Sequence, residues 1–290
     1  MGKPEAVFCE PVISPPPVTT GWKAQLNLTF AHRDSGSYLA QRSQFGPLGL
    51  QKILYPEGPH TAHGIILHPP GGIAGGDQLT INIGVGEGAS ALLTTPGATK
   101  WYRSAGAQAR QNVELNVADQ ACLEWLPQEN IVFDQALAAS HTHVKLGAHA
   151  RFIGWEITAF GRPAANLAFE QGCFSQRWKI EQAGRLLWLE QGELHGNDPR
   201  FKARAGLQGY TVMGTLVAVG ATIDAALLEE LRNLNAEGLT GITQTPRGVL
   251  LVRCLSPNTE SARCYLNQVW ALLRPTVIGA TAHHPRIWNT

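Results

Sequence analysis

Three acidic residues occupy positions where a carboxylate could do chemistry: Asp77, Glu156 and Glu190. Paired carboxylates serve glycoside cleavage, and carboxylate oxygens also bind divalent cations. The sequence does not place the three acids within reach of one another, so a solvated charge at the end of a strand is the competing interpretation for each. No G-x-S-x-G elbow or H-E-x-x-H helix accompanies them.

Asp77 lies near the end of an unusual segment, His68 to Leu79, in which four glycines bracket two apolar residues. A phosphate-binding loop would need a helix N-terminus and a G-K-[ST] ending, whereas a strand-like pattern follows here. Nucleotide binding is therefore not predicted. The alternatives for the segment are a functional loop and a tight glycine turn between two strands.

Histidine and cysteine give weaker signals of a metal site. His141 and His143 would lie on one face of a strand, but no third ligand follows at a recognisable spacing, so a solvated strand face is the favoured interpretation. His60 with His63 and the pair 283–284 rank no higher. The five cysteines are scattered without a C-x-x-C pair, which predicts reduced and mostly buried thiols.

Composition narrows the class of partner. The chain has 290 residues, 44% of them hydrophobic, and a net charge of +1. The hydrophobic content predicts a large core, and the near-zero net charge gives no sign of a charged surface that would bind nucleic acid or membrane lipid. No apolar run approaches the roughly 20 residues that span a bilayer, and no signal peptide is evident. We expect a cytoplasmic protein whose partners are proteins or small ligands.

The elements that must position these residues are mostly strands. Apolar and polar residues alternate over 22–30, 79–85 and 113–117, which predicts strands with one buried face. Further short runs occur at 64–68, 90–95, 151–158, 174–180, 185–190, 211–219 and 248–255. Because helical patterns do not alternate with them, a doubly wound α/β fold is not predicted, and the alternation favours antiparallel sheet.

Two helices are predicted near the C-terminus. Asp224 caps a segment over 225–237 that Gly238 ends, and a second helix runs over 259–274 until Pro275 ends it. Residues 1–20 are rich in proline and predict a flexible lead-in, which leaves one domain over 21–290.

Several blocks of sequence, from about Trp22 to the C-terminus, resemble the urease accessory protein family UreD, also called UreH. The blocks that carry the resemblance contain His68, Pro69, Pro70, Gly71, Gly72, Gly75, Gly76 and Asp77, then Thr95, Pro96, Gly97, Lys100, Tyr102 and Arg103, then Pro127, Gln128, Glu129 and Phe133. The stretches 154–156, 160–162 and 285–290 resemble the family as well. One departure is Leu167, where the family usually carries an acid, so no role for an acid is carried over there.

The resemblance implies a mainly β fold, an irregular β-helix-like stack of many short strands with two α-helices near the C-terminus. It implies a maturation factor without catalytic residues, which joins the F accessory protein and the GTPase G on apo-urease and supports nickel insertion. Nickel would pass transiently, with no tightly bound cofactor. A relay needs ligands that release the ion, which suits carboxylates better than a closed His/Cys cage. Asp77, Glu156 and Glu190 are thus expected to line a polar passage.

Partner binding is expected to involve Trp270, Arg286 and Trp288, with core packing as the alternative for Trp270. Two other classes of function remain open on the residues alone: a β-helix or β-sandwich enzyme that cleaves carbohydrate with a carboxylate pair, and a β-rich interaction domain without a metal role. For Asp77 the alternative to a nickel ligand is a turn former whose side chain bonds backbone N–H groups, a role that Asn also fills.

Overall fold

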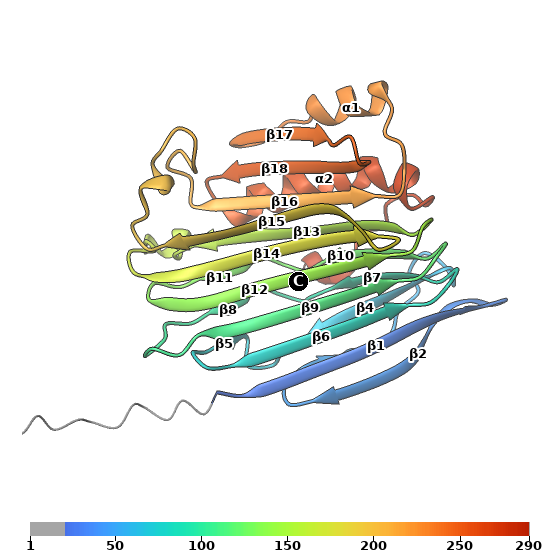
Figure 1. Cartoon of the computed structure of the whole chain (residues 1–290), viewed down its shortest axis with the longest axis horizontal. Helices are drawn as coiled ribbons and strands as arrows, with labels where there is room; N and C mark the ends of the chain where they lie inside the picture. Colours follow the sequence, from blue (N-terminus) through green and yellow to red (C-terminus); the bar gives the residue numbers. More distant parts are fainter. Residues whose placement is uncertain (1–20, 290) are drawn as a thin grey trace, which may run out of the picture.

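The computed structural model describes residues 21–289, so the predicted flexible lead-in over 1–20 lies outside the described residues. The strands wind in successive coils that build two facing sheets (Figure 1). The first sheet has the order β15-β14-β12-β9-β6-β1-β2. Its strands are β1 Lys23–Arg33, β2 Gly36–Phe45, β6 Gln78–Val85, β9 Ala109–Val117, β12 Ala136–Leu146, β14 Gly172–Gln182 and β15 Arg185–His195.

The second sheet runs β17-β18-β16-β13-β10-β7-β4-β3, and three short strands extend it. Its strands are β3 Gly49–Leu50, β4 Thr61–Leu67, β7 Ser90–Thr94, β10 Cys122–Leu126, β13 Arg151–Phe160, β16 Val212–Val219, β17 Leu239–Gln244 and β18 Val249–Ser256. The short strands are β5 Gly72–Ile73, β8 Thr99–Trp101 and β11 Asn130–Val132, and they pair in parallel with one another.

Each coil contributes a strand to both sheets, and consecutive coils pair in parallel along β1, β6, β9, β12 and β14 and along β4, β7, β10 and β13. The predicted mainly β, β-helix-like stack is confirmed. The expectation of mostly antiparallel sheet is wrong, because antiparallel pairing is confined to hairpins and to the strands at the ends of the stack. The outer face of the first sheet meets solvent, and this one-sided exposure produces the alternation that antiparallel sheets usually show.

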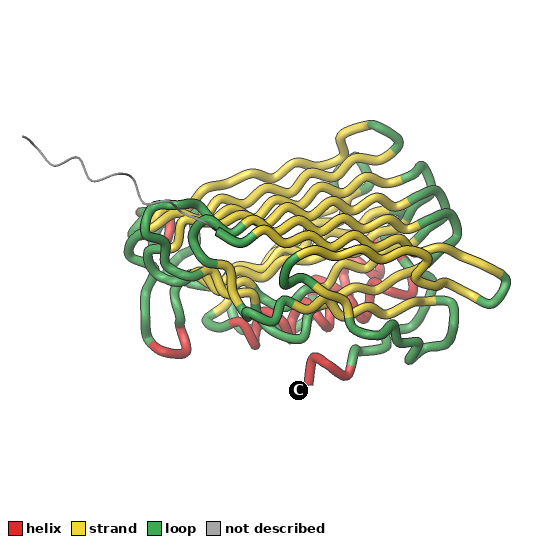
Figure 2. Tube along the Cα trace, turned by 90° about the horizontal axis from the view of Figure 1, so that it is seen from below, coloured by secondary structure: helices red, strands yellow, loops and turns green. Residues whose placement is uncertain are grey.

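The main core lies between the two sheets. Leu26, Leu28 and Phe30 of β1 point into it, while the residues between them face outward. The second sheet is buried on both faces, since α2 covers its outer side and contacts β13, β16 and β18 (Figure 2). Residues 152–160 of β13 are accordingly all buried.

The helices are α1 Ala225–Arg232 and α2 Thr259–Val277, with short 3-10 turns at Pro163–Ala165, Pro199–Phe201 and Arg286–Asn289. Asp224 caps α1 as predicted, accepting the Leu227 N–H at 2.8 Å, but α1 ends five residues earlier than expected. The prediction that Pro275 ends the second helix is wrong. The missing N–H of Pro275 removes one helical bond, but the helix continues to Val277, and the N–H of the C-cap residue Ile278 donates to the Arg274 carbonyl at 2.8 Å.

Candidate functional site

A carboxylate lies in the middle of the core between the sheets. Glu156 of β13 is only 5% exposed and points toward the first sheet. Its Oε1 accepts hydrogen bonds from Asn130 Nδ2 at 3.0 Å and Ser140 Oγ at 3.2 Å. Its Oε2 accepts from Gln176 Nε2 at 2.8 Å and from the indole N–H of Trp178. Donors on β11, β12 and β14 therefore converge on one acidic side chain.

No cation neutralises this carboxylate among the described residues, since all four of its partners are neutral. Burial raises the pKa of Glu156, and the hydrogen bonds from Trp178, Gln176 and Ser140 oppose that shift without cancelling it. The negative charge of Glu190 raises the pKa of Glu156 further. Such a site favours a proton or a bound cation over an isolated negative charge.

Other polar groups share the interior with Glu156. Thr158 projects from the same face of β13, and its hydroxyl is buried without a hydrogen-bond partner. Asn130, which lies opposite Thr158, also accepts the indole N–H of Trp101 at 3.0 Å. The Thr158 hydroxyl and the Glu156 carboxylate are thus buried polar groups that their neighbours satisfy only in part.

Glu190 connects this interior group to the surface. It lies on β15 opposite Trp178, its side chain is 26% exposed, and it forms an ion pair with Arg253 of β18. Glu190 and Gln176 both line a hollow of about 200 Å³. Gln176 also donates to Glu156, so this one side chain lies between the hollow and the buried carboxylate. The structure thus brings Glu156 and Glu190 into one polar region.

Asp77 lies apart from that region, at the start of β6. Its Oδ1 accepts the Trp22 N–H at 2.7 Å and its Oδ2 accepts the Ala74 N–H at 2.9 Å. Gly76, just before it, has φ +93°, a conformation that favours glycine. Both carboxylate oxygens are occupied by backbone donors, so this geometry favours the turn-forming role over that of a free ligand.

The residues that carry the family resemblance gather at one end of the coils. Gly72 pairs with Lys100, and Lys100 pairs with Ile131, so the three blocks stack on one another. A Cβ on Gly72 would lie 2.4 Å from the Tyr102 ring, which requires glycine there. The Gln128 N–H donates to Thr95 Oγ1 at 2.9 Å.

Within the described residues, three surface hollows lie at this end of the coils. Lys100, Tyr102 and Phe133 line one of about 600 Å³, and Tyr102, Arg103 and Phe133 line one of about 760 Å³. His68, Gly71, Thr95, Pro96 and Gly97 line a smaller one of about 60 Å³. Burial lowers the pKa of His68, and the charge of Asp77 opposes that shift. Two other residues of the blocks accept hydrogen bonds: the Pro127 carbonyl from the indole N–H of Trp155, and the Glu129 carbonyl from the N–H of Thr99. Pro69 and Pro70 are exposed, and Gly75 packs on Ser104.

The aromatic residues expected at a partner surface lie inside the chain. Trp270 is 0% exposed and its indole donates to Glu124 at 2.6 Å. Trp288 is 7% exposed and its indole donates to Thr94 Oγ1 at 2.8 Å. These contacts favour core packing for both tryptophans, whereas Arg286, two residues before Trp288, is exposed.

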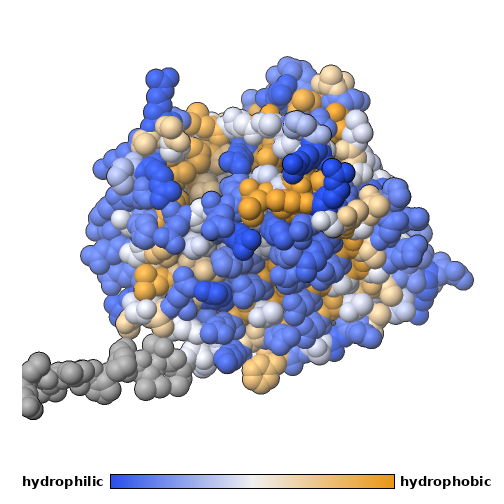
Figure 3. Space-filling model, in the orientation of Figure 1, coloured by the Kyte–Doolittle hydropathy of each residue, from blue (hydrophilic) through white to orange (hydrophobic). Residues whose placement is uncertain are grey.

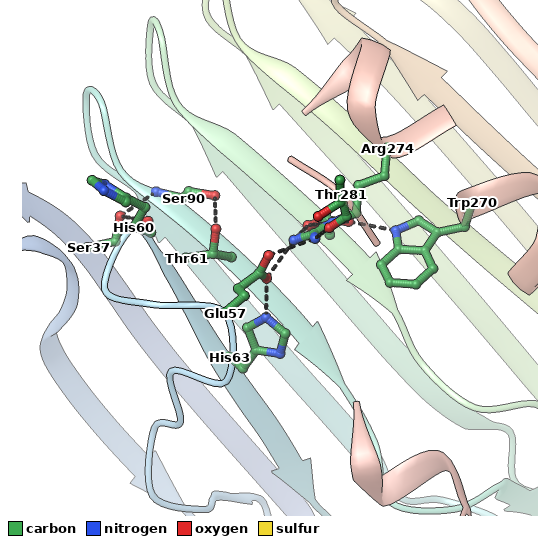
Figure 4. A network of polar contacts seen from close by, with 10 residues as sticks. Ser37, Glu57, His60, Thr61, His63, Ser90, Trp270, Arg274 and Thr281 are labelled. Carbon is green, nitrogen blue, oxygen red and sulfur yellow. Dashed lines mark hydrogen bonds and ion pairs between the residues drawn. The ribbon is translucent and has the colours of Figure 1, made fainter. Parts of the chain in front are cut away.

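A second set of charges is buried between the second sheet and α2, and Figure 4 shows how it lies. The Arg274 guanidinium, 0% exposed, donates to Glu124 at 3.0 Å and to Glu57 at 2.6 Å. Glu57 also contacts His63 Nε2 at 2.6 Å. Burial acts to raise the pKa of Glu57, but hydrogen bonds with His63 and Arg274 outweigh it and lower that pKa to about 2. Here, unlike at Glu156, the buried acids have a cation.

The histidines at 141 and 143 share one face of β12, as predicted. His143 lies 2.7 Å from Glu181 and 3.2 Å from Glu114, but Lys179 and Lys145 already pair with these acids. Over residues 21–289, one group combines three side chains with donor atoms close enough to hold a metal ion: Cys173, Glu193 and His195. Sequence reasoning did not single out these three residues, nor Glu57, Glu124 and Arg274.

The fold and the site define a β-solenoid built around a buried, uncompensated carboxylate. Comparison with known proteins gives the family. A family model described as UreD urease accessory protein matches residues 23–289. The chain is 47% identical over 272 residues to the urease accessory protein UreD of Janthinobacterium sp. (strain Marseille), covering 92% of each chain. It is 46% identical to the UreD of Dechloromonas aromatica (strain RCB) over 283 residues, which covers 96% of this chain and 98% of that one.

The chain therefore belongs to the UreD urease accessory protein family, and its role is in urease maturation. In the part of the chain that the structure describes, no helix has both the length and the apolar character needed to cross a membrane.

Proposed function

We propose that the chain is a non-enzymatic scaffold that works with the F and G accessory proteins in the cytoplasm to support nickel insertion into apo-urease. We propose further that nickel passes transiently through its interior along Glu190 and Glu156. The single observation that supports this passage is the buried Glu156 carboxylate, which has four neutral donors and, within residues 21–289, no cation.

The chemistry of the region suits a cation that has to leave again. Glu156 and Glu190 offer carboxylate oxygens, and Ser140, Thr158 and Gln176 offer neutral oxygens around them. Such oxygen donors hold a divalent transition metal more weakly than thiolate or imidazole sets do. Glu190 already pairs with Arg253, so an arriving ion competes with a surface-exposed guanidinium for the same carboxylate. Asp77 is not included, because backbone N–H groups occupy both of its oxygens.

Carbohydrate cleavage by Glu156 and Glu190 has less support. Ligand pockets usually measure about 300–1,000 Å³, whereas the hollow beside Glu190 measures about 200 Å³. Glu156 itself is buried behind Gln176 and Trp178, which leaves no room for a sugar ring at its carboxylate.

Protein partners are supported by the surface. The solvent-facing side of the first sheet is largely hydrophilic and is interrupted by an apolar patch in its upper half (Figure 3). Leu186 and Leu189 on the edge strand β15 are 40% and 46% exposed, and Trp22 and Phe45 near β1 and β2 are 60% and 67% exposed. Apolar groups that remain exposed in this way are typical of surfaces that partners cover.

The test of the passage is nickel loading of urease in cells that express the urease subunits and the accessory proteins together with this chain. With Glu156→Gln, nickel per urease should fall severalfold, because a neutral amide of the same shape cannot balance a divalent charge. Glu190→Gln should act in the same direction. The matched control is Glu230→Gln, an exposed acid on α1, which should load urease like the wild type.

Two further readouts separate transport from assembly. Glu156→Gln should melt no lower than the wild type, because the neutral amide removes an uncompensated buried charge, and it should still co-purify with the F protein. Wild-type nickel loading by a folded Glu156→Gln chain would refute the passage while leaving the scaffold role intact. Unchanged loading when the whole chain is omitted would refute the maturation role.

A further inference from the structure

A second group of metal-binding side chains lies on the outer face of the β14–β15 hairpin, away from the buried carboxylate. Cys173 and His195 are directly opposite each other in the register, and Glu193 lies two residues from His195 on the same face. One donor atom from each of the three residues lies within 4.8 Å of the others. The intervening Phe174 and Leu194 point into the core, which fixes the three donors outward.

The backbone beneath the group is held tightly. The Gly196 N–H donates to the Gly172 carbonyl at 3.0 Å, next to His195 and Cys173. A Cβ on Gly172 would lie 2.3 Å from the Ala136 carbonyl oxygen, and one on Gly196 would lie 2.2 Å from the Gln171 nitrogen. Close backbone contacts next to Cys173 and His195 therefore hold this end of the hairpin at a fixed separation, and rigid backbone support favours a metal site.

The charges around the group leave it available to a cation. Glu193 contacts His195 Nε2 at 2.8 Å, and both side chains are more than half exposed. Arg200 lies close by, but its guanidinium is bound to Asp198 and to the main-chain carbonyl of Glu193 rather than to the Glu193 carboxylate. The His143 cluster differs, because lysine side chains occupy its acids.

We propose that Cys173, Glu193 and His195 form a binding site for a single divalent transition-metal ion of the nickel, cobalt and zinc class. A thiolate, an imidazole and a carboxylate suit such borderline ions, and three protein ligands leave a coordination position open to water or to a ligand from another protein. The site goes beyond the proposed passage and does not depend on it. Glu193 also lines the hollow that contains Glu190, so an ion bound there would lie at the rim of that hollow.

The Cys173 thiol carries a proton that a metal ion has to displace. Partial burial and the neighbouring Glu193 raise the pKa of Cys173 to about 11, so the thiol keeps its proton until a cation displaces it. Binding of one ion would release that proton to solvent as the metal–sulfur bond forms.

The test uses the purified full-length chain and the metals alone. Equilibrium dialysis with Ni²⁺ should give one ion per chain that is lost in Cys173→Ser, and Co²⁺ should give a thiolate-to-metal charge-transfer band that is absent from the same variant. Glu193→Gln and His195→Gln should each weaken binding by about tenfold or more, since loss of even an outer-shell partner typically costs about 10- to 100-fold. Cys264→Ser, which removes an exposed thiol outside the group, should bind like the wild type.

A second measurement does not depend on the variants folding. In the wild-type chain, Ni²⁺ should protect Cys173 from alkylation and leave Cys264 reactive. The proposal is overturned if Ni²⁺ protects neither thiol, or if Cys173→Ser retains the charge-transfer band and the bound ion. Glu156→Gln should keep both signals, so loss of nickel delivery through the interior and loss of this site would be told apart.

Discussion

Replacing Arg274 by Met tests how the buried charges between the second sheet and α2 contribute to stability. Arg274 is fully buried, and it is the cation for Glu124, which is 1% exposed, and for Glu57, which is 13% exposed. Methionine fills much of the same volume but leaves the Glu124 carboxylate with the Trp270 N–H as its remaining donor. Burial raises the pKa of Glu124, and the Arg274 guanidinium opposes that shift. Loss of the guanidinium therefore leaves the Glu124 carboxylate either charged without a cation or protonated.

The expected loss is about 3–5 kcal/mol of unfolding free energy, the usual result of removing one partner of a buried pair. For a chain of this length that corresponds to a fall in melting temperature of about 10 °C. Urea unfolding followed by tryptophan fluorescence measures it, because Trp270 and Trp288 lie beside the network.

A double variant supplies the control. Adding Glu124→Gln to Arg274→Met removes the stranded charge and should recover at least about 1 kcal/mol, as groups in direct contact usually couple by about 0.5–3 kcal/mol. Arg253→Met, which breaks an ion pair in which the arginine side chain is 53% exposed, should change stability by less than about 1 kcal/mol. A loss below about 1 kcal/mol for Arg274→Met, or equal losses for the single and double variants, would contradict the reasoning.

Three further outcomes are expected. Because the folded-state pKa of Glu156 is raised, its contribution to stability is fully present below pH 4.5 and is lost as pH rises through that raised value. Glu156→Gln should therefore gain stability relative to the wild type as pH increases. Urea unfolding from pH 4 to 8 measures this difference. Gly72→Ala should lower the melting temperature, because its Cβ would lie 2.4 Å from the Tyr102 ring, whereas Gly97→Ala, with nothing within 4 Å, should not. Trp288→Ala should cost about 3–5 kcal/mol in the same unfolding assay; a stable variant that loses the F protein in a pull-down would instead support the partner-binding role.

The sequence allowed the strands with one solvent-facing side to be predicted, but not the direction of their partners. The alternation over 22–30 indicates that one face of the strand is exposed to solvent and the other is buried. Besides its hairpin partner β2, the neighbour of β1 is β6, about fifty residues later and parallel, and no local signal encodes that pairing. Strand β10 is not predicted, because Glu124 interrupts its short apolar run with a charged residue although all five of its residues are buried.

The candidate site was predictable only in part. Glu156 and Glu190 were found as acids in strand-like segments, but the donors around Glu156 come from β11, β12 and β14, and nothing in the sequence marks Ser140 or Gln176 as its neighbours. Glu124 and Arg274 are separated by 150 positions, so their pairing is equally hidden.

The Cys173 group shows a further limit. The hairpin turns at Ala183 and Gly184, and counting back from the turn would place Leu194 opposite Cys173. A bulge between Ile180 and Glu181 shifts the register by one residue and brings His195 there instead. A one-residue shift of this kind moves every side chain to the other face of the strand, and the sequence gives no sign of it.

The bonds from Arg274 to Glu57 join residues 217 positions apart and close most of the coiled chain into one loop. Contacts over such separations form after the coils between them are in place, because the entropy of closing so long a loop is lost first. Interactions that are absent from the folding transition state act on the rate of unfolding and leave the rate of folding almost unchanged. We therefore expect the charged cluster, which joins β4, β10 and α2, to act mainly on the rate of unfolding and so on the lifetime of the folded chain.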